Sequence, residues 1–220
     1  MKNLTKYSLI VFISLFCLQS SAQTFGIKGG FNLANFLEKD DDETYSNDFK
    51  MNPGFHIGAT VDIPFGDIFS LESGLLLTTK GTKLEEESVG YEVTTKVNLY
   101  YLDVPITLKA SHELGDGIKV FGEVGPYIGF GLSGKVKITT KYQGEEGTEE
   151  KDITWGSDEE NDDLKRLDAG LTFGGGVEIN AIQIGISYDL GLANIDTYTD
   201  NGFTTKNRVL KFSVGYRFMK

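Results

Sequence analysis

The chain has 220 residues and a formal net charge of -11 at pH 7. Such acidity argues against nucleic-acid binding, which needs a basic face to displace counterions. The length fits one domain, and the 27 glycines and 12% aromatic residues favour long paired strands over a helical bundle.

Residues 1–22 have the features of a secretory signal peptide. Two lysines give a basic start, residues 8–18 are apolar but too few to cross a bilayer as a helix, and residues 20–22 form a small-residue cleavage site. Cys17 lies inside this segment without the small preceding residue that a lipoprotein site needs. We therefore expect a mature domain over residues 23–220 that has no thiol. Losing the two lysines changes its net charge from -11 to -13.

Eight later segments alternate between apolar and polar residues, which is typical of strands with one apolar face. In the second segment, Phe55, Ile57 and Ala59 alternate with His56 and Thr60. The segments are residues 24–33, 55–63, 69–80, 100–109, 118–132, 166–179, 182–192 and 210–218. Their lengths suit tilted strands that cross a membrane, and no stretch after the signal approaches the roughly 20 apolar residues of a membrane helix.

The connections between these segments alternate in length. Short ones are predicted at residues 64–67, 111–117 and 180–181, and long acidic ones near residues 35–50, 81–95, 134–165 and 194–206. Outer-membrane barrels have short periplasmic turns at one rim and long loops at the other. We therefore predict an all-β fold, an eight-stranded antiparallel up-and-down transmembrane β-barrel with both termini on the periplasmic side.

Charged residues inside the segments fall on the polar face, which should line the lumen. The predicted lumenal charge network consists of Lys28, Asp62, Glu72, Asp103, Lys109, Lys119, Glu123, Arg166, Asp168, Glu178, Asp189, Lys211 and Arg217. Six cations and seven anions nearly cancel, as expected for ion pairs in a narrow lumen. The strands of a soluble secreted barrel would also alternate between apolar and polar residues, but the positive and negative charges on its solvated face need not cancel.

Aromatic residues are predicted at two levels of the barrel. Those at the periplasmic rim are Phe25, Phe65, Phe69, Tyr216 and Phe218, and those near the other rim are Phe36, Phe55, Tyr100 and Phe130. This distribution indicates the interfacial girdles of a membrane barrel.

Four motifs in these segments carry a family resemblance. They are LYYLDVPITLK at residues 99–109, GPYIGFG at 125–131, GGGVE at 174–178 and VGYRF at 214–218. Over its whole mature part the chain resembles the outer-membrane protein β-barrel domain of small porin-family proteins of Gram-negative bacteria. The resemblance implies an outer-membrane location and insertion by the barrel-assembly machinery.

The sequence offers few candidates for chemistry. His56 is predicted to face the lumen, where Glu72 or Asp62 and a hydroxyl could join it as in a Ser-His-acid hydrolase, but no nucleophile motif accompanies it. The acidic loops lack the spaced ligands and turn glycine of a dedicated Ca²⁺ site. Trp155, the only tryptophan, either anchors the longest loop or touches a partner. We predict no catalytic residue, no cofactor and no metal.

These observations favour a non-enzymatic outer-membrane protein with a structural, envelope-stabilising or surface-interaction role through acidic extracellular loops. Its expected contacts are outer-membrane lipid, the assembly machinery and an extracellular partner of the loops, and it is expected to be a monomer. Side chains fill the interior of an eight-stranded barrel, but lumenal glycines loosen that filling. A narrow passive channel for water or small ions is therefore the alternative, and a lipid or peptide hydrolase the third reading.

Overall fold

The computed structural model describes residues 23–45 and 49–218. The predicted signal peptide at residues 1–22 lies outside these ranges and stays a prediction. The strands are β1 (Thr24–Lys39), β2 (Phe49–Lys50), β3 (Asn52–Phe65), β4 (Phe69–Ser88), β5 (Tyr91–Gly115), β6 (Ile118–Tyr142), β7 (Glu145–Asp152), β8 (Leu167–Ile179), β9 (Ile182–Gly191) and β10 (Thr204–Phe218). A short 3₁₀ helix, η2, covers Asp200–Gly202. No helix within the described ranges is long and apolar enough to cross a membrane.

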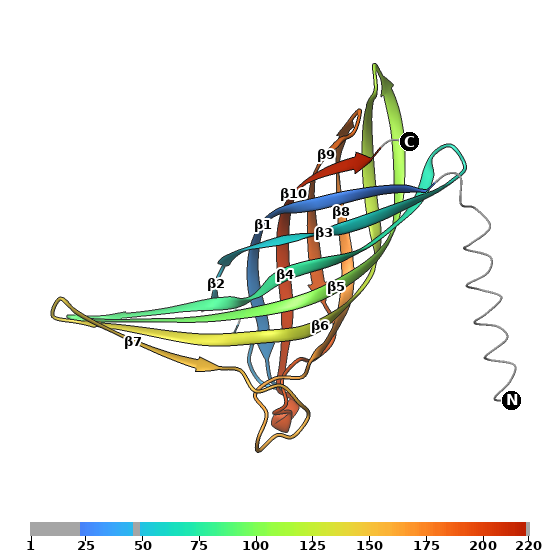
Figure 1. Ribbon diagram of the computed structural model, residues 1–220. Helices are drawn as coiled ribbons and strands as arrows, with labels where there is room; N and C mark the ends of the chain where they lie inside the picture. Colours follow the sequence, from blue (N-terminus) through green and yellow to red (C-terminus); the bar gives the residue numbers. More distant parts are fainter. Residues whose placement is uncertain (1–22, 46–48, 219–220) are drawn as a thin grey trace, which may run out of the picture.

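Eight of these strands form a closed ring (Figure 1). Their order is β1, β3, β4, β5, β6, β8, β9 and β10, each antiparallel to its neighbours, and β10 returns to pair with β1 from Phe25↔Phe218 to Lys39↔Thr204. The remaining strands, β2 and β7, pair only with β4 and β6 respectively. The predicted eight-stranded antiparallel barrel is confirmed.

The two faces of the ring differ as the period-two pattern predicts. On the outer face, Phe25, Ile57, Val124, Ile184 and Val214 are 48 to 59% exposed. A closed band of exposed apolar side chains requires apolar surroundings, because exposing it to water would be unfavourable. The polar residues between them point inward and are mostly buried.

Of the predicted long loops, residues 81–95 are strand and turn instead, and so is the first part of residues 134–165, as far as Asp152. β4 and β5 continue to a turn at Val89 and Gly90, and β6 turns at Gln143 and Gly144 into β7. The residues in these turns with positive φ (Gly90, Gln143 and Gly144) permit tight hairpins there. The resulting four-stranded extension, residues 82–97 and 135–152, together with the short strand β2 that pairs with its edge, is called the wing below. Figure 1 shows it running out to one side of the barrel.

The predicted aromatic girdles are present with one exception. Phe25, Phe65, Phe69, Tyr216 and Phe218 are exposed at the short-turn end, and Phe55, Tyr100 and Phe130 are exposed nearer the loops. Phe36 is buried instead, because the alternation of β1 turns it inward.

Candidate functional site

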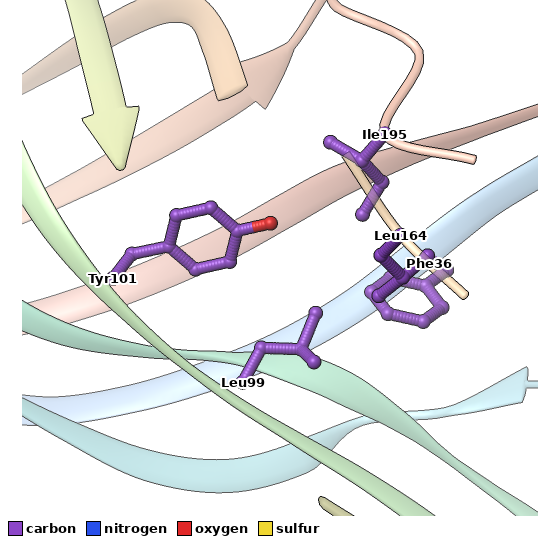
Figure 2. Close-up of a cluster of buried hydrophobic side chains, with 5 residues drawn as sticks. All are labelled: Phe36, Leu99, Tyr101, Leu164 and Ile195. Carbon is purple, nitrogen blue, oxygen red and sulfur yellow. The ribbon is translucent and has the colours of Figure 1, made fainter. Parts of the chain in front are cut away.

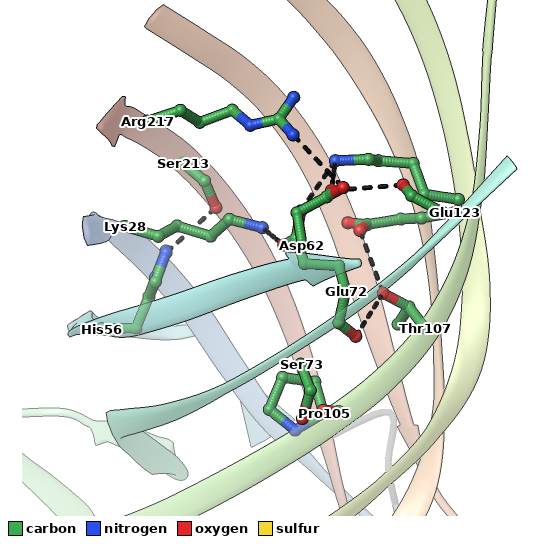
Figure 3. A network of polar contacts seen from close by, with 12 residues as sticks. Lys28, His56, Asp62, Glu72, Ser73, Pro105, Thr107, Glu123, Ser213 and Arg217 are labelled. Carbon is green, nitrogen blue, oxygen red and sulfur yellow. Dashed lines mark hydrogen bonds and ion pairs between the residues drawn. The ribbon is translucent and has the colours of Figure 1, made fainter. Parts of the chain in front are cut away.

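Ion pairs fill the half of the lumen nearest the short turns (Figure 3). Lys109 lies among three carboxylates, in an ion pair with Asp62, 3.1 Å from Glu72 and 3.3 Å from Glu178. Arg217 joins the same group, at 3.2 Å from Asp62 and 2.7 Å from Glu178. Five of the eight ring strands (β3, β4, β5, β8 and β10) supply these side chains, so the network connects opposite sides of the ring.

Two further residues extend this network toward the middle of the barrel. Lys28 forms an ion pair with Glu72, and Thr107 donates to Glu123 across 3.4 Å. Nearly all of these groups are removed from solvent, so each charge depends on its partners for stability.

A histidine lies midway along the lumen. His56 Nδ1 is 2.7 Å from Asn32 Oδ1, and Nε2 is 3.0 Å from Ser213 Oγ. The order hydroxyl, imidazole, amide is that of a nucleophile, a base and an orienting group. The adjoining cavity holds about 30 Å³, room for roughly two water molecules and none for an acyl substrate.

A second charge network occupies the half of the lumen nearest the loops. Lys80 is fully buried, 2.9 Å from both Asp103 and Asp168, and its ammonium lies over the rings of Tyr101 and Tyr127 at 4.7 and 4.5 Å. The further members are Lys211 in an ion pair with Asp189, Tyr127 and Asn207 as donors to Asp168, and Thr172 as a donor to Asp189. Such a network holds its rings and charges in one packed arrangement.

An apolar cluster closes the lumen above this network (Figure 2). Phe36, Leu99, Tyr101, Leu164 and Ile195 are buried together, contributed by β1, β5 and the two loops that follow β7 and β9. The loop segments are held in place by bridges from Leu164 to Trp155 and to Asp196. The loop end of the barrel is therefore covered by side chains.

Trp155 anchors its loop to the barrel. Its indole packs edge-on against Tyr101, with ring centroids 5.7 Å apart, and occupies the space over Gly131. A Cβ atom at residue 131 would lie 2.4 Å from the indole, so only glycine admits the ring there. Lumenal glycines were predicted to leave the interior loosely filled. Gly131 instead makes room for the large indole of Trp155, which fills that space.

The structure brings most of the predicted network residues together, but two lie elsewhere. Lys119 projects from the short-turn rim, 45% exposed, and is 3.9 Å from Glu113. Arg166 precedes β8, so strand alternation does not apply to it. It is exposed, donates to the Gly131 carbonyl at 3.0 Å and lies beside Phe130 and Trp155.

Lys80 is the lumenal cation that the predicted network lacks. The sequence does place Lys80 on the polar face of residues 69–80, which could have identified it as lumenal. It was left out of the predicted network because it is the last residue of that segment and borders the predicted loop. The described lumen thus holds five cations, Lys28, Lys80, Lys109, Lys211 and Arg217, and seven carboxylates.

The wing carries charged pairs on its outward face. Lys50 and Lys83 both pair with Glu85, and the hydrogen bond from Lys50 is the largest influence that lowers the pKa of Glu85 to about 2. Lys135 and Lys137 pair with Glu150 at 2.8 and 3.9 Å. These cross-strand contacts explain why such a polar segment forms strands.

One carboxylate, Asp163, joins the start of the loop after β7 to the end of β7. Asp163 accepts hydrogen bonds from Thr154 and from Lys151 at 2.7 to 2.9 Å. Partial burial works to raise the pKa of Asp163, but these donors outweigh burial and hold that pKa below its usual range. Within residues 23–45 and 49–218, no cluster of three His, Cys, Asp or Glu side chains has the geometry of a metal site.

Comparison with known proteins gives a family match. The model of the outer membrane protein beta-barrel domain matches residues 19–197. No curated protein sequence matches the chain significantly.

Solved structures with low sequence identity are also similar. Ail, the attachment invasion locus protein of Yersinia pestis, is 16% identical with a TM-score of 0.36, covering 90% of this chain and 99% of that chain. OprG from Pseudomonas aeruginosa is 13% identical with a TM-score of 0.44, covering 90% and 97%. Neisserial surface protein A is 11% identical with a TM-score of 0.41, covering 88% and 95%.

Proposed function

The chain belongs to the outer membrane protein β-barrel domain family, and from that premise we propose that it is a non-conducting, non-enzymatic barrel that acts through its surface. Its short turns face the periplasm, and its loops and wing face the cell exterior. In this role it stabilises the envelope and presents an acidic surface to a partner.

The filled lumen is the observation that carries this proposal. Two ion-pair networks and an apolar cluster follow one another along the barrel, and the cavity around His56 holds only about 30 Å³. An ion that crossed this interior would have to disrupt networks of buried ion pairs, and separating buried charges from their partners is strongly unfavourable. The arrangement therefore favours a scaffold over the alternative of a narrow channel.

The loop end offers a surface for a partner. An open hollow of about 600 Å³ lies where β1, β4 and the start of β2 meet, lined by the three glutamates Glu38, Glu85 and Glu86 and by aromatic and aliphatic side chains. A mixed acidic and apolar surface suits a basic partner with apolar side chains, because ion pairs and buried apolar area then act together. Loops and hairpins on a rigid frame commonly carry binding functions.

Conductance tests the proposal. The refolded protein in planar bilayers is expected to give no current steps above the lipid background. The double variant Tyr101→Ala/Tyr127→Ala, which empties the loop-end half of the lumen, is the positive control and is expected to conduct. Steady current steps from the unaltered protein would overturn the proposal in favour of a channel.

The hydrolase reading has its own test at Ser213. An active serine nucleophile reacts with fluorophosphonates, whereas this hydroxyl is enclosed beside a cavity too small for such a reagent. We expect no label on the folded protein. Labelling that is lost in Ser213→Ala and in His56→Ala would show an accessible catalytic group and contradict a purely structural role.

A further inference from the structure

Four lysines stand directly opposite one another on the outward face of the wing. The strand register pairs Lys50 with Lys83, Lys83 with Lys96, and Lys96 with Lys137, across β2, β4, β5 and β6. These residues are called the lysine row. Like charges directly opposite one another destabilise a sheet, so the row is unfavourable for folding by itself.

The carboxylates nearby compensate the row only in part. Glu85 serves both Lys50 and Lys83, and Glu150 serves both Lys137 and the adjoining Lys135. Among the residues that the structure describes, Lys96 has no carboxylate within 4.0 Å in an ion pair. The row is thus a cationic strip on a chain whose net charge is -11.

The position of the row points to its ligand. The outward face of the wing continues the apolar outer face of the barrel, where Tyr100, Leu102 and Phe130 are exposed. Lys96 precedes Tyr100 by four residues on β5, so it lies about 13 Å further from the barrel along that strand. At a tilt of roughly 45° this places Lys96 about 9 Å further along the membrane normal, at the depth of lipid headgroups.

The lean of the wing turns this face toward the membrane surface. Figure 1 shows the wing running out sideways from the ring. Because the outward face of the wing is continuous with the lipid-facing band of the barrel, we expect this face to overlie the plane of the headgroups. Neighbouring strands lie about 4.8 Å apart, so the four lysines span roughly 15 Å. A strip of this length can contact more than one anionic group of the same headgroup.

We propose that the lysine row binds the phosphate groups of the anionic glycolipid in the outer leaflet, a phosphorylated lipid A headgroup. Lysine ammonium groups bind phosphate as point charges, and a cluster of them beside a membrane is attracted to anionic lipid. The inference rests on the proposed outward orientation of the loop end and adds a lipid partner to the proposed role. It explains why like charges are kept opposite one another: bound phosphate supplies the missing counter-charge.

Lipid binding by the folded protein tests this inference. The protein in dodecyl maltoside micelles is titrated with radiolabelled diphosphoryl lipid A and with the dephosphorylated lipid. The variant Lys83→Gln/Lys96→Gln/Lys137→Gln is compared with Lys39→Gln/Lys119→Gln/Lys141→Gln, which removes the same charge from exposed sites outside the row. Heat-modified gel mobility verifies that both variants are folded.

The row variant is expected to bind diphosphoryl lipid A at least tenfold more weakly, the control variant within twofold of the unaltered protein, and the dephosphorylated lipid poorly in all cases. Binding should weaken from 50 to 500 mM salt, and 10 mM inorganic phosphate should not displace the lipid. The inference is overturned if both variants lose binding equally, if the row variant retains it, or if inorganic phosphate competes efficiently. None of these outcomes depends on conductance, so failure here is distinct from failure of the proposed scaffold role.

Discussion

Lys80 is the residue on which the loop-end network depends. Its ammonium is fully buried between Asp103 and Asp168 and lies over the rings of Tyr101 and Tyr127. Removing one partner of a buried ion pair leaves the others uncompensated. Lys80→Met should therefore lower the free energy of unfolding by about 3–5 kcal/mol, measured from urea titrations of the vesicle-folded protein.

Lys119 provides the matched control for this substitution. Its distance of 3.9 Å from Glu113 is long and both side chains are largely exposed, so Lys119→Met should change stability by about 0–1 kcal/mol. If Lys80→Met and Lys119→Met lowered the free energy of unfolding by comparable amounts, the lumenal charges would be hydrated rather than buried. These two lysines also show the limit of sequence reasoning at this scale: alternation predicts the face of a residue but not its depth along the barrel.

The pH dependence of the Trp155 loop follows from Asp163, whose folded pKa lies below its usual value. A carboxyl with a lowered folded pKa contributes full stability above the unfolded pKa, and loses it as pH falls through the folded pKa. The fluorescence of the only tryptophan should therefore stay constant from pH 8 to pH 5 and shift to the red only below about pH 4. Asp163→Asn should show the red shift already at pH 7, with no further step on acidification. A step near neutral pH in the unaltered protein would show that another group controls the loop.

At the scale of elements, the wing is an extension of the barrel that the barrel does not need. Beyond the ring, residues 136–142 of β6 pair with β5 and residues 145–151 of β7 pair with β6, whereas the β6–β8 pairing that belongs to the ring covers residues 118–130. Replacing residues 136–151 by an Asn-Gly turn should leave a barrel with unchanged heat-modified gel mobility and a thermal midpoint within a few degrees of that of the unaltered protein. An unfolded product from this deletion would mean that the wing nucleates the barrel.

The loop after β7 should behave differently from the wing. Replacing residues 153–166 by a Gly/Ser linker removes Trp155 and Leu164 from the apolar cluster, and the variant should pass current in planar bilayers.

The sequence predicts the strands inside the ring better than those of the wing. Within the ring, apolar residues on one face make the period of two visible, as at residues 118–132. In the wing, both faces are rich in polar residues, so the period of two is hidden. Lys137 and Glu150 come into contact only once β6 and β7 have paired. That pairing depends on long-range register and on a hairpin turn, so composition alone predicted a solvated loop.

At the scale of the whole molecule, strand number, closure and the polar lumen all follow from the alternation of the sequence. The seal at the loop end does not, because Leu164 and Ile195 come from irregular segments that carry no periodic signal. Only the folded ring brings these segments over Leu99 and Tyr101. The sequence therefore left a channel open as an alternative, and the packed interior argues against it.

The pairing of β1 with β10 imposes an order of events on assembly. The first and last strands of the ring close it, from Phe25↔Phe218 to Lys39↔Thr204. Until β10 arrives, β1 and β9 each present a row of unpaired backbone groups, which hydrocarbon cannot satisfy. A seven-stranded intermediate that lacks β10 should therefore not be stable in the bilayer. We therefore expect stable insertion to require the carboxyl-terminal strand.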